Sequence, residues 1–480
     1  MFLPFLACVS CAGWLDVQPK TSVEEEDLFA REYGFKDALT GIYVKMGKPA
    51  LYGQTTSYEY LDMLAGIYDN APDVINWSSI YAYDGTYQST VNSIYSSMYN
   101  VIANVNNLLK FVDQNREVIK TENYYETIKG EALGVRAFLH FDLLRMFGPI
   151  YMNDPDGAAV PYRTKFDNVA TPILSASEVL DMVIGDLLAA EELLAGHDSE
   201  IFNYDDSADP FTEMRQMRMN VWAVRAMLAR VYCYKGDAES KALALQYAKD
   251  VIESGHFSLA PSGRKEAQEP IWGTEVIFGL YIYDYYKTVD EFFKNASYSY
   301  LLSAYSSNID TWFPQNDDRY SFFTPQYSVS GEPSIDVLLK YDQNRYSSTR
   351  DNYSAMNTQP LIRLPEMYYI AAECEPDPET SASYLDEVIF SRTGQYSATQ
   401  TSGYDQLDGR TIYGVNTGQT VRVNELYKEY LKEYYGEGQL FFFYKRFAFR
   451  AFPKPDDDTM DPADYQMPLP DDEYTYGNNN

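Results

Sequence analysis

Apolar residues recur every three or four positions in several separate segments of the chain, which is the pattern of helices that bury one face. The first segment covers residues 23–46, where an acidic first turn suits the helix dipole. Its apolar positions are Leu28, Phe29, Phe35, Leu39, Ile42 and Met46. The same spacing recurs in residues 91–112 and 130–148, so these segments are predicted to be amphipathic helices.

Two further features indicate a helix start and a helix pair. Ser175 stands three residues before Glu178, which is the spacing of a capping box at the start of a helix. Residues 221–254 read as two helices joined by a short turn at Gly236 and Asp237. Small and large apolar residues alternate through this pair, as they do where tetratricopeptide-type helix hairpins interlock.

The helical period is lost in two stretches that are rich in tyrosine and small polar residues. Residues 55–88 combine many tyrosines with Asn, Asp, Gly and Ser, and are predicted to form a long aromatic loop. Residues 258–360 are irregular over a greater length, and such stretches usually carry function. Helical spacing resumes within residues 360–450, before a Pro- and Asp-rich tail that we expect to be ordered by docking. The chain is therefore predicted to be mostly α, with tetratricopeptide-like helix pairs and a loop-rich region.

The composition indicates a globular and strongly acidic protein. Of 480 residues, 45% are apolar, which is enough for a large core. The 38 basic and 70 acidic residues give a formal net charge of −32, which argues against nucleic-acid or anionic-lipid binding through a basic face. Aromatic residues make up 16% of the chain, led by 45 tyrosines, whose flat rings and hydroxyl edges suit carbohydrate or peptide surfaces.

Metal and thiol chemistry are not predicted. The four cysteines and three histidines are not spaced like metal ligands. Cys233 and Cys374 lie in apolar helical sequence and are interpreted as small buried hydrophobic residues without a chemical role. An acidic run in the tail could offer calcium ligands, but it lacks the spacing and glycine of a dedicated site and is interpreted as a solvated loop. This run contains Asp456, Asp457, Asp458, Asp461 and Asp464.

The first residues are interpreted as the end of a processing signal. Residues 1–7 are apolar but too few to span a bilayer, and no other segment is long and apolar enough to do so. A basic start is missing, so we expect the sequence to begin partway into a signal. The apolar run leads through small residues to Cys8 and Cys11, either of which fits a lipid-bearing cysteine of a bacterial lipoprotein. The local pattern alone leaves both open.

A series of motifs follows in a fixed order along nearly the whole chain. They are WLDVQP, DLFAREYGFKDALTGIY, YNVIANVNNLL, KGEALGVRAFLHFDLLRMFGPIY, ASEVLDMVIGDLLAAEELL, VRAMLARVYCYKGD, IRLPEMYYIAAE, YLKEYYGEGQLFFFYKR and LPDDEYTYGN. Each motif alone is weak, but in this order they resemble the SusD/RagB-type outer-membrane lipoproteins of Bacteroidetes glycan-uptake systems.

The resemblance implies one SusD-like domain over residues 11–480, preceded by a residual lipoprotein signal at residues 1–10. Four tetratricopeptide-like helix pairs are expected, mainly within residues 20–260 and 360–450. The loop-rich region, at about residues 258–360, would contribute the glycan-binding face.

The resemblance also bears on the lipid anchor. In this family the lipid-bearing cysteine lies a few residues before a Phe/Trp-Leu-Asp sequence, which here is Trp14, Leu15 and Asp16. Cys11 is therefore the expected lipidation site, and Cys8 is the alternative. Apart from the acyl lipid on that cysteine, no cofactor is expected.

The resemblance implies a binding protein rather than an enzyme. Such a protein lies at the cell surface as a lipid-anchored lid on a SusC-like TonB-dependent transporter of the outer membrane, captures an oligosaccharide and delivers it for import. A glycoside hydrolase is one alternative, because the chain is rich in carboxylates, but no hydrolase signature is present. A peptide-binding component of a related uptake system is another alternative. A structural adaptor that binds peptide in a helical groove would fit the helix pairs but would leave the aromatic loops unexplained.

Exposed aromatic rings are the candidate ligand contacts, because the C–H face of a sugar ring lies flat against an aromatic ring. Polar groups nearby would bind the sugar hydroxyls. The candidates from the two irregular stretches are Asn76, Trp77, Tyr81, Tyr83, Trp312, Arg319 and Tyr320. For each ring the competing interpretation is packing on its own loop, and for Arg319 it is a carboxylate ion pair that anchors the loop.

Overall fold

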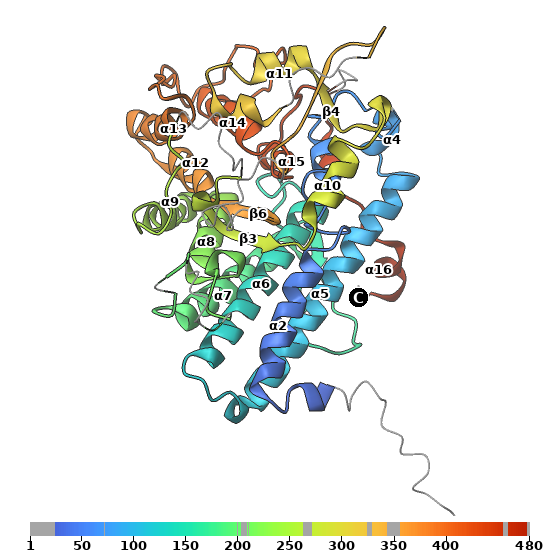
Figure 1. Cartoon of the computed structure of the whole chain (residues 1–480), viewed down its shortest axis with the longest axis vertical. Helices are drawn as coiled ribbons and strands as arrows, with labels where there is room; N and C mark the ends of the chain where they lie inside the picture. The colour runs from blue at the N-terminus through green and yellow to red at the C-terminus, as the bar shows by residue number, and fades with distance from the viewer. Residues whose placement is uncertain are drawn as a thin grey trace, which may run out of the picture.

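The computed structural model describes residues 25–477 apart from residues 72, 199, 203–208, 210, 263–270, 324–328, 343–355 and 455–458. The predicted signal and lipidation site, with Cys8 and Cys11, lie outside the described residues. Helices dominate the described part of the chain, and its strands form small two-stranded antiparallel sheets (Figure 1). The prediction of a mostly α fold is confirmed.

Pairs of packed helices form the body of the described structure. They are α2 (Glu32–Met46) with α5 (Thr86–Gln114), α6 (Tyr124–Phe147) with α7 (Ala176–Leu194), α8 (Val221–Lys235) with α9 (Ala238–Ile252), and α12 (Leu364–Cys374) with α13 (Pro378–Thr393). Each pair packs on the next, through contacts of α5 with α6, α7 with α8, and α9 with α12. Figure 1 shows this stack from α2 and α5 in blue to α12 and α13 in orange. The tetratricopeptide-like arrangement expected from the sequence is therefore present.

The predicted helix ends are also found. The Ser175 Oγ accepts a hydrogen bond from Glu178 N, and the Glu178 carboxylate accepts one from Ser175 N at 2.9 Å, which completes the capping box of α7. Gly236 ends α8 with a φ of 77°, a backbone conformation that glycine adopts without strain. The carboxylate of Asp237 then caps α9 by accepting from Ser240 N at 2.9 Å.

The prediction of a long aromatic loop over residues 55–88 is wrong for much of that stretch. It contains α3 (Tyr60–Leu64) and α4 (Trp77–Ile80), and α5 begins at Thr86. Most tyrosines of the stretch are core residues, and Tyr58 packs among aromatic rings that include Phe292, Phe293 and Tyr341. All five residues of α3 are buried and α4 has only four residues, so neither helix shows a helical period in the sequence.

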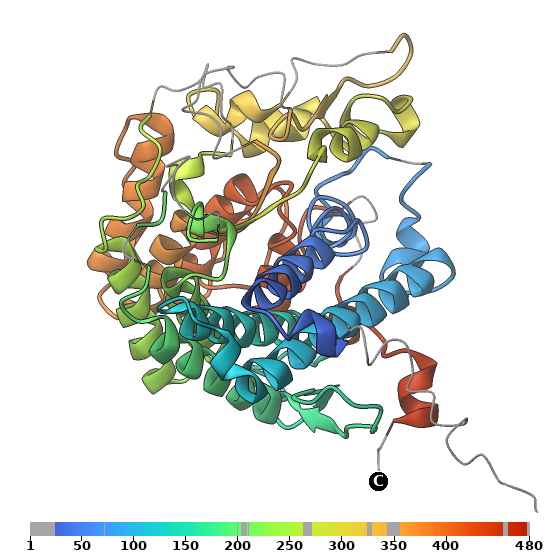
Figure 2. The same cartoon turned by 60° about the horizontal axis from the view of Figure 1, so that its bottom comes forward.

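The residues between α9 and α12 form a layer over one end of the stack, which we call the insertion (residues 253–363). The strands β3 (Val276–Tyr281) and β6 (Thr358–Arg363) pair and return the chain to the stack. Between them lie α10 (Tyr285–Phe293), β4 (Ser303–Tyr305), α11 (Ser306–Trp312) and β5 (Ile335–Val337), with β4 paired to β5. Figures 1 and 2 show α10 and α11 in yellow above the helices. The predicted irregular region thus holds several short elements.

The end of the chain returns to the helix body. After α13 come α14 (Val421–Glu433) and α15 (Leu440–Arg446), and the described tail ends in α16 (Asp471–Tyr476). Met467 is buried, and its N–H donates to the carbonyl of Met146 at 3.0 Å. The described part of the tail is therefore docked, as expected.

Candidate functional site

The structure divides the seven predicted ligand contacts into buried and surface residues. The side chains of Tyr83, Trp312 and Arg319 are buried. The residues with exposed or partly exposed side chains are Asn76, Trp77, Tyr81 and Tyr320. For the three buried residues the competing interpretation, packing within the protein, is the one that the structure supports.

Two of the buried residues hold the fold together. The hydroxyl of Tyr83 donates to the carbonyl of Asp464, so this ring fixes the tail segment instead of facing solvent. Trp312 ends α11, which packs on β4, β5 and α14. Neither ring presents a face to a ligand at the surface.

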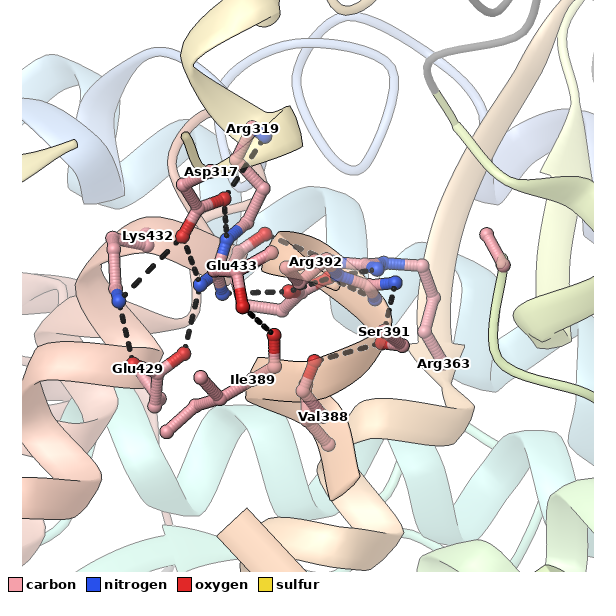
Figure 3. A network of polar contacts seen from close by, with 12 residues as sticks. Asp317, Arg319, Arg363, Val388, Ile389, Ser391, Arg392, Glu429, Lys432 and Glu433 are labelled. Carbon is pink, nitrogen blue, oxygen red and sulfur yellow. Dashed lines mark hydrogen bonds and ion pairs between the residues drawn. The ribbon is translucent and has the colours of Figure 1, made fainter. Parts of the chain in front are cut away.

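Arg319 is fully buried and makes several charged hydrogen bonds (Figure 3). Its guanidinium donates to both carboxylate oxygens of Asp317, at 2.9 and 2.7 Å. It also donates to Glu429 at 2.8 Å and to Glu433 at 3.0 Å, both on α14. The interpretation that Arg319 anchors its loop is confirmed, and the side chain has no exposed surface with which to contact a sugar.

These ion pairs extend into a larger buried network, which we call the charge cluster. Its cations are Arg319, Lys340, Arg363, Arg392 and Lys432, and its anions are Glu275, Asp317, Glu429, Glu433 and Glu437. Five positive and five negative groups make the cluster formally neutral. All ten side chains are buried, and they come from the insertion, β6, α13, α14 and the turn after α14.

Glu433 is the centre of the charge cluster. Its Oε1 accepts from Arg363 at 2.6 Å and from Arg392 at 3.1 Å, and its Oε2 accepts from Arg319 and Arg392. Burial alone would raise the pKa of this carboxyl. The guanidinium groups of Arg392, Arg363 and Arg319 outweigh burial and hold the pKa of Glu433 well below its usual range, so the carboxyl stays ionised.

The first irregular stretch, residues 55–88, is hydrogen-bonded to the insertion, which contains the second. Asn70 N donates to the carbonyl of Ser303, and Asp73 N donates to the carbonyl of Ser299, both at 3.2 Å. The Asp69 carboxylate accepts from Tyr305 N at 2.7 Å and also from the Asn308 side chain. The segment before α4 is therefore fastened to β4 and to the start of α11.

A surface hollow of about 520 Å³ lies at this junction, and we call it the β4 hollow. It is lined by Tyr305, Ser306, Ser307, Asp310, Pro333 and Ser334. The predicted residue Tyr320 lies at its edge, because the Tyr320 hydroxyl donates to Asp310 Oδ1 at 2.9 Å. Its volume is in the range of small-ligand sites.

The β4 hollow combines one flat ring with several polar groups. The ring of Tyr305 is partly exposed, while Ser307 and Asp310 are exposed. A ring face can contact the C–H groups of a sugar, and the serine hydroxyls and the carboxylate can exchange hydrogen bonds with its hydroxyls. Tyr305, Ser307 and Asp310 are not among the residues predicted from the sequence, although they lie in the same Ser- and Tyr-rich stretch as Tyr320.

The other surface candidates lie on α4 and do not line the β4 hollow. Trp77 is half-buried against the core. The Tyr81 hydroxyl donates to the carbonyl of Leu64 at 3.1 Å, and the Lys454 ammonium lies 4.7 Å from the centre of the Tyr81 ring. The structure therefore brings Tyr320 to the β4 hollow but keeps Asn76, Trp77 and Tyr81 on a separate segment.

The structure offers little for a metal ion. Among the described residues, no group of three or more His, Cys, Asp or Glu side chains could hold one. Asp461 and Asp464 of the acidic run instead form a capping box at the start of a short helical turn. The remaining aspartates of that run, Asp456, Asp457 and Asp458, lie outside the described residues. No described helix has the length and apolar content needed to cross a bilayer.

Comparison with known proteins shows which proteins the chain resembles. A SusD-like family model, described as "Starch-binding associating with outer membrane", matches residues 13–233. SusD-like protein P25 of Formosa agariphila is 22% identical over 455 residues, which cover 85% of this chain and 83% of that protein. The chain is similar to SusD-like proteins.

Solved structures show that this SusD-like chain shares the fold of its relatives. A SusD superfamily protein from Bacteroides thetaiotaomicron has a TM-score of 0.68 at 21% identity, with 93% of this chain and 98% of the other covered. A SusD-like carbohydrate binding protein from Bacteroides vulgatus has a TM-score of 0.64 at 19% identity, with 93% and 96% covered.

Removing the charge of Glu433 should strongly destabilise this SusD-like protein. Glu433→Gln leaves three buried guanidinium groups short of one negative charge, and we expect a loss of about 3–5 kcal/mol in the free energy of unfolding. The shift of the urea midpoint measures it. The exposed Glu192→Gln on α7 is the matched control. An effect of Glu433→Gln no larger than that of the control would contradict the role of the cluster.

The buried carboxyl of Asp69 should make the stability of the fold depend on pH. Burial raises the pKa of the Asp69 carboxyl to about 6. The hydrogen bonds from Tyr305 and Asn308 lower this pKa, but they offset only part of the effect of burial. In the unfolded chain the pKa of an aspartate is about 4. The contribution of Asp69 to the free energy of unfolding is therefore fully present below about pH 4 and is lost as the pH rises through about 6. The loss amounts to up to about 2–3 kcal/mol. Asp69→Asn stays neutral and should flatten this part of a profile of urea midpoint against pH. Equal flattening in the exposed control Asp73→Asn would overturn this assignment.

Proposed function

We propose that this SusD-like protein binds a glycan at the cell surface and delivers it, uncleaved, to a SusC-like TonB-dependent transporter. The match of residues 13–233 to a family model supports this proposal, because that model is described as starch-binding and associated with the outer membrane. The similar protein from Bacteroides vulgatus is named as carbohydrate binding. The observation that carries the proposal for this chain is the β4 hollow, where a tyrosine ring stands among hydroxyl and carboxylate groups.

The proposed mode of binding is stacking with polar contacts at its edge. A sugar ring lies against Tyr305, and Ser307, Asp310 and Ser334 bind its hydroxyls. The Tyr320 hydroxyl holds Asp310 in place through the hydrogen bond of 2.9 Å. A longer oligosaccharide would extend toward α4, where Asn76, Trp77 and Tyr81 are the proposed further contacts.

The composition of the hollow supports binding without cleavage. Glycoside hydrolases use two carboxyl groups that flank the scissile bond. Of the described residues that line the β4 hollow, Asp310 is the one acid. The many carboxylates of the charge cluster are buried and paired with cations, so they cannot serve as an exposed acid and base.

The proposed place of action is the outer membrane, through an acyl lipid on Cys11. The family model is described as associating with that membrane. Partner recognition is proposed for the tetratricopeptide-like helix pairs, which leaves the insertion and the β4 hollow free to face incoming glycan.

Binding can be tested by calorimetry across a polysaccharide panel. The wild-type chain should bind at least one glycan, and Tyr305→Ala should lower that affinity about 2- to 10-fold, because one ring contact is lost. Tyr396→Ala is the matched control, since Tyr396 is 65% exposed and lies after α13, away from the hollow's lining. Equal affinities of wild type and Tyr305→Ala would contradict the site, and release of reducing ends by pure protein would contradict binding without cleavage.

The anchor can be tested separately. Cys11→Ala should abolish metabolic labelling with a fatty acid and release the protein from the outer-membrane fraction, because the sulfur that would carry the diacylglycerol is gone. Cys8→Ala should leave both unchanged. If only Cys8→Ala releases the protein, the lipid is on Cys8 and the assignment is wrong.

A further inference from the structure

Two cysteines that are far apart in sequence lie side by side in the helix body. Cys233 is near the end of α8 and Cys374 is the last residue of α12, with 141 positions between them. Their sulfur atoms are 3.8 Å apart, and both thiols are free. Both side chains are buried, at 4% and 7% exposure, which confirms the burial expected from the sequence. Nothing in the local sequence around either cysteine indicates that they meet.

The surroundings of the pair differ from an ordinary apolar core. Arg446 Nη1 donates to Cys233 Sγ at 3.1 Å and to Glu373 at 2.7 Å. The Cys374 thiol also donates to Cys233 Sγ, and this hydrogen bond, with burial, raises the pKa of Cys374. Two donors, one of them cationic, therefore point at the sulfur of Cys233.

One of the two thiols is reachable from outside. Cys374 lines an open groove of about 760 Å³ between α9 and the start of α14. Glu373, Glu375 and Arg422 line the same groove together with apolar side chains such as Leu245 and Phe447. A small molecule in the groove could contact Cys374, whereas Cys233 and Arg446 line a separate hollow of only about 50 Å³.

We propose that Cys233 and Cys374 are a redox-active pair that closes to a disulfide when it meets a small-molecule disulfide. Cys374 loses its thiol proton and attacks the oxidant's S–S bond, which forms a mixed disulfide, and the leaving sulfur takes up a proton as the first small thiol; the raised pKa of Cys374 makes this the slow step. Cys233 then loses its proton and attacks the sulfur of Cys374, and the second small thiol leaves with a proton. Two protein S–H bonds and one oxidant S–S bond give one protein S–S bond and two small thiols; the cysteines lose two electrons and the oxidant gains them. For the bond to form, the sulfur atoms must approach from 3.8 Å to about 2.05 Å.

The disulfide would join two neighbouring helix pairs, one that precedes the insertion in the sequence and one that follows it. α8 belongs to the third pair and α12 to the fourth, and the chain between the two cysteines carries the charge-cluster residues of the insertion and the β4 hollow. Closing this long loop stabilises the folded state. The inference rests on the proposed function in one respect, the location of the protein. Export removes the chain from the reducing cytosol, so the proposed location is where the chain would meet the oxidant.

The test uses the purified, reduced full chain with added glutathione disulfide. After incubation, the protein is denatured without reductant, alkylated and mapped by mass spectrometry, which separates this pair from Cys8 and Cys11. We expect the peptides of Cys233 and Cys374 to be linked and unalkylated, and the thermal midpoint to rise by roughly 3 °C and return on reduction. Alkylation of both cysteines, or a separate glutathione on each, would overturn the proposal.

Single variants give the matched controls. Cys233→Ser should keep glutathione on Cys374, because no second thiol is present to displace it, and oxidation should then leave the thermal midpoint unchanged. An unmodified Cys374 in this variant would overturn its assignment as the entry point. No glycan, membrane or transporter enters these measurements, so their failure and a failure of the proposed function can be told apart.

Discussion

The buried charge cluster around Glu433 is the constraint on which the rest of the structure depends. Removing ten charged groups from water is costly, and only close pairing of every group offsets that cost. The partners come from the insertion, the fourth helix pair and α14, so these elements satisfy one another's charges in a single relative placement. The cluster therefore acts mainly to specify where the insertion lies on the helix stack.

The shape of the β4 hollow depends on where the insertion lies on the helix stack. Asp317 and Arg319 fix the segment after α11 to α14, while Lys340 and Glu437 fix the segment after β5. Between these anchors, β4 and β5 pair, and Asp69 fastens the opposite loop to Tyr305. A ligand site built on loops is thus held by a rigid base, as is common where binding residues lie on connecting segments.

Much of the helical body could be predicted from the sequence, because a helix with one buried face carries its period in local spacing. The Ser175 cap and the turn at Gly236 are local in the same sense. The tyrosines of residues 55–88 misled the prediction, since α3 is buried on all sides and α4 is too short to show a helical period. Contacts between distant segments left no local signal: Arg319 meets Glu433 across 114 positions, and Tyr305 meets Asp69 across 236.

An experimental structure of the protein with a bound oligosaccharide, chosen from the glycans that it retains, tests this view of the molecule most directly. We predict a sugar ring against Tyr305 in the β4 hollow, with Asp310 and Ser307 on its hydroxyls and the charge cluster unchanged. A ligand bound elsewhere, for example in the hollow of about 400 Å³ between Tyr99 and Tyr476, with the β4 hollow empty, would contradict it.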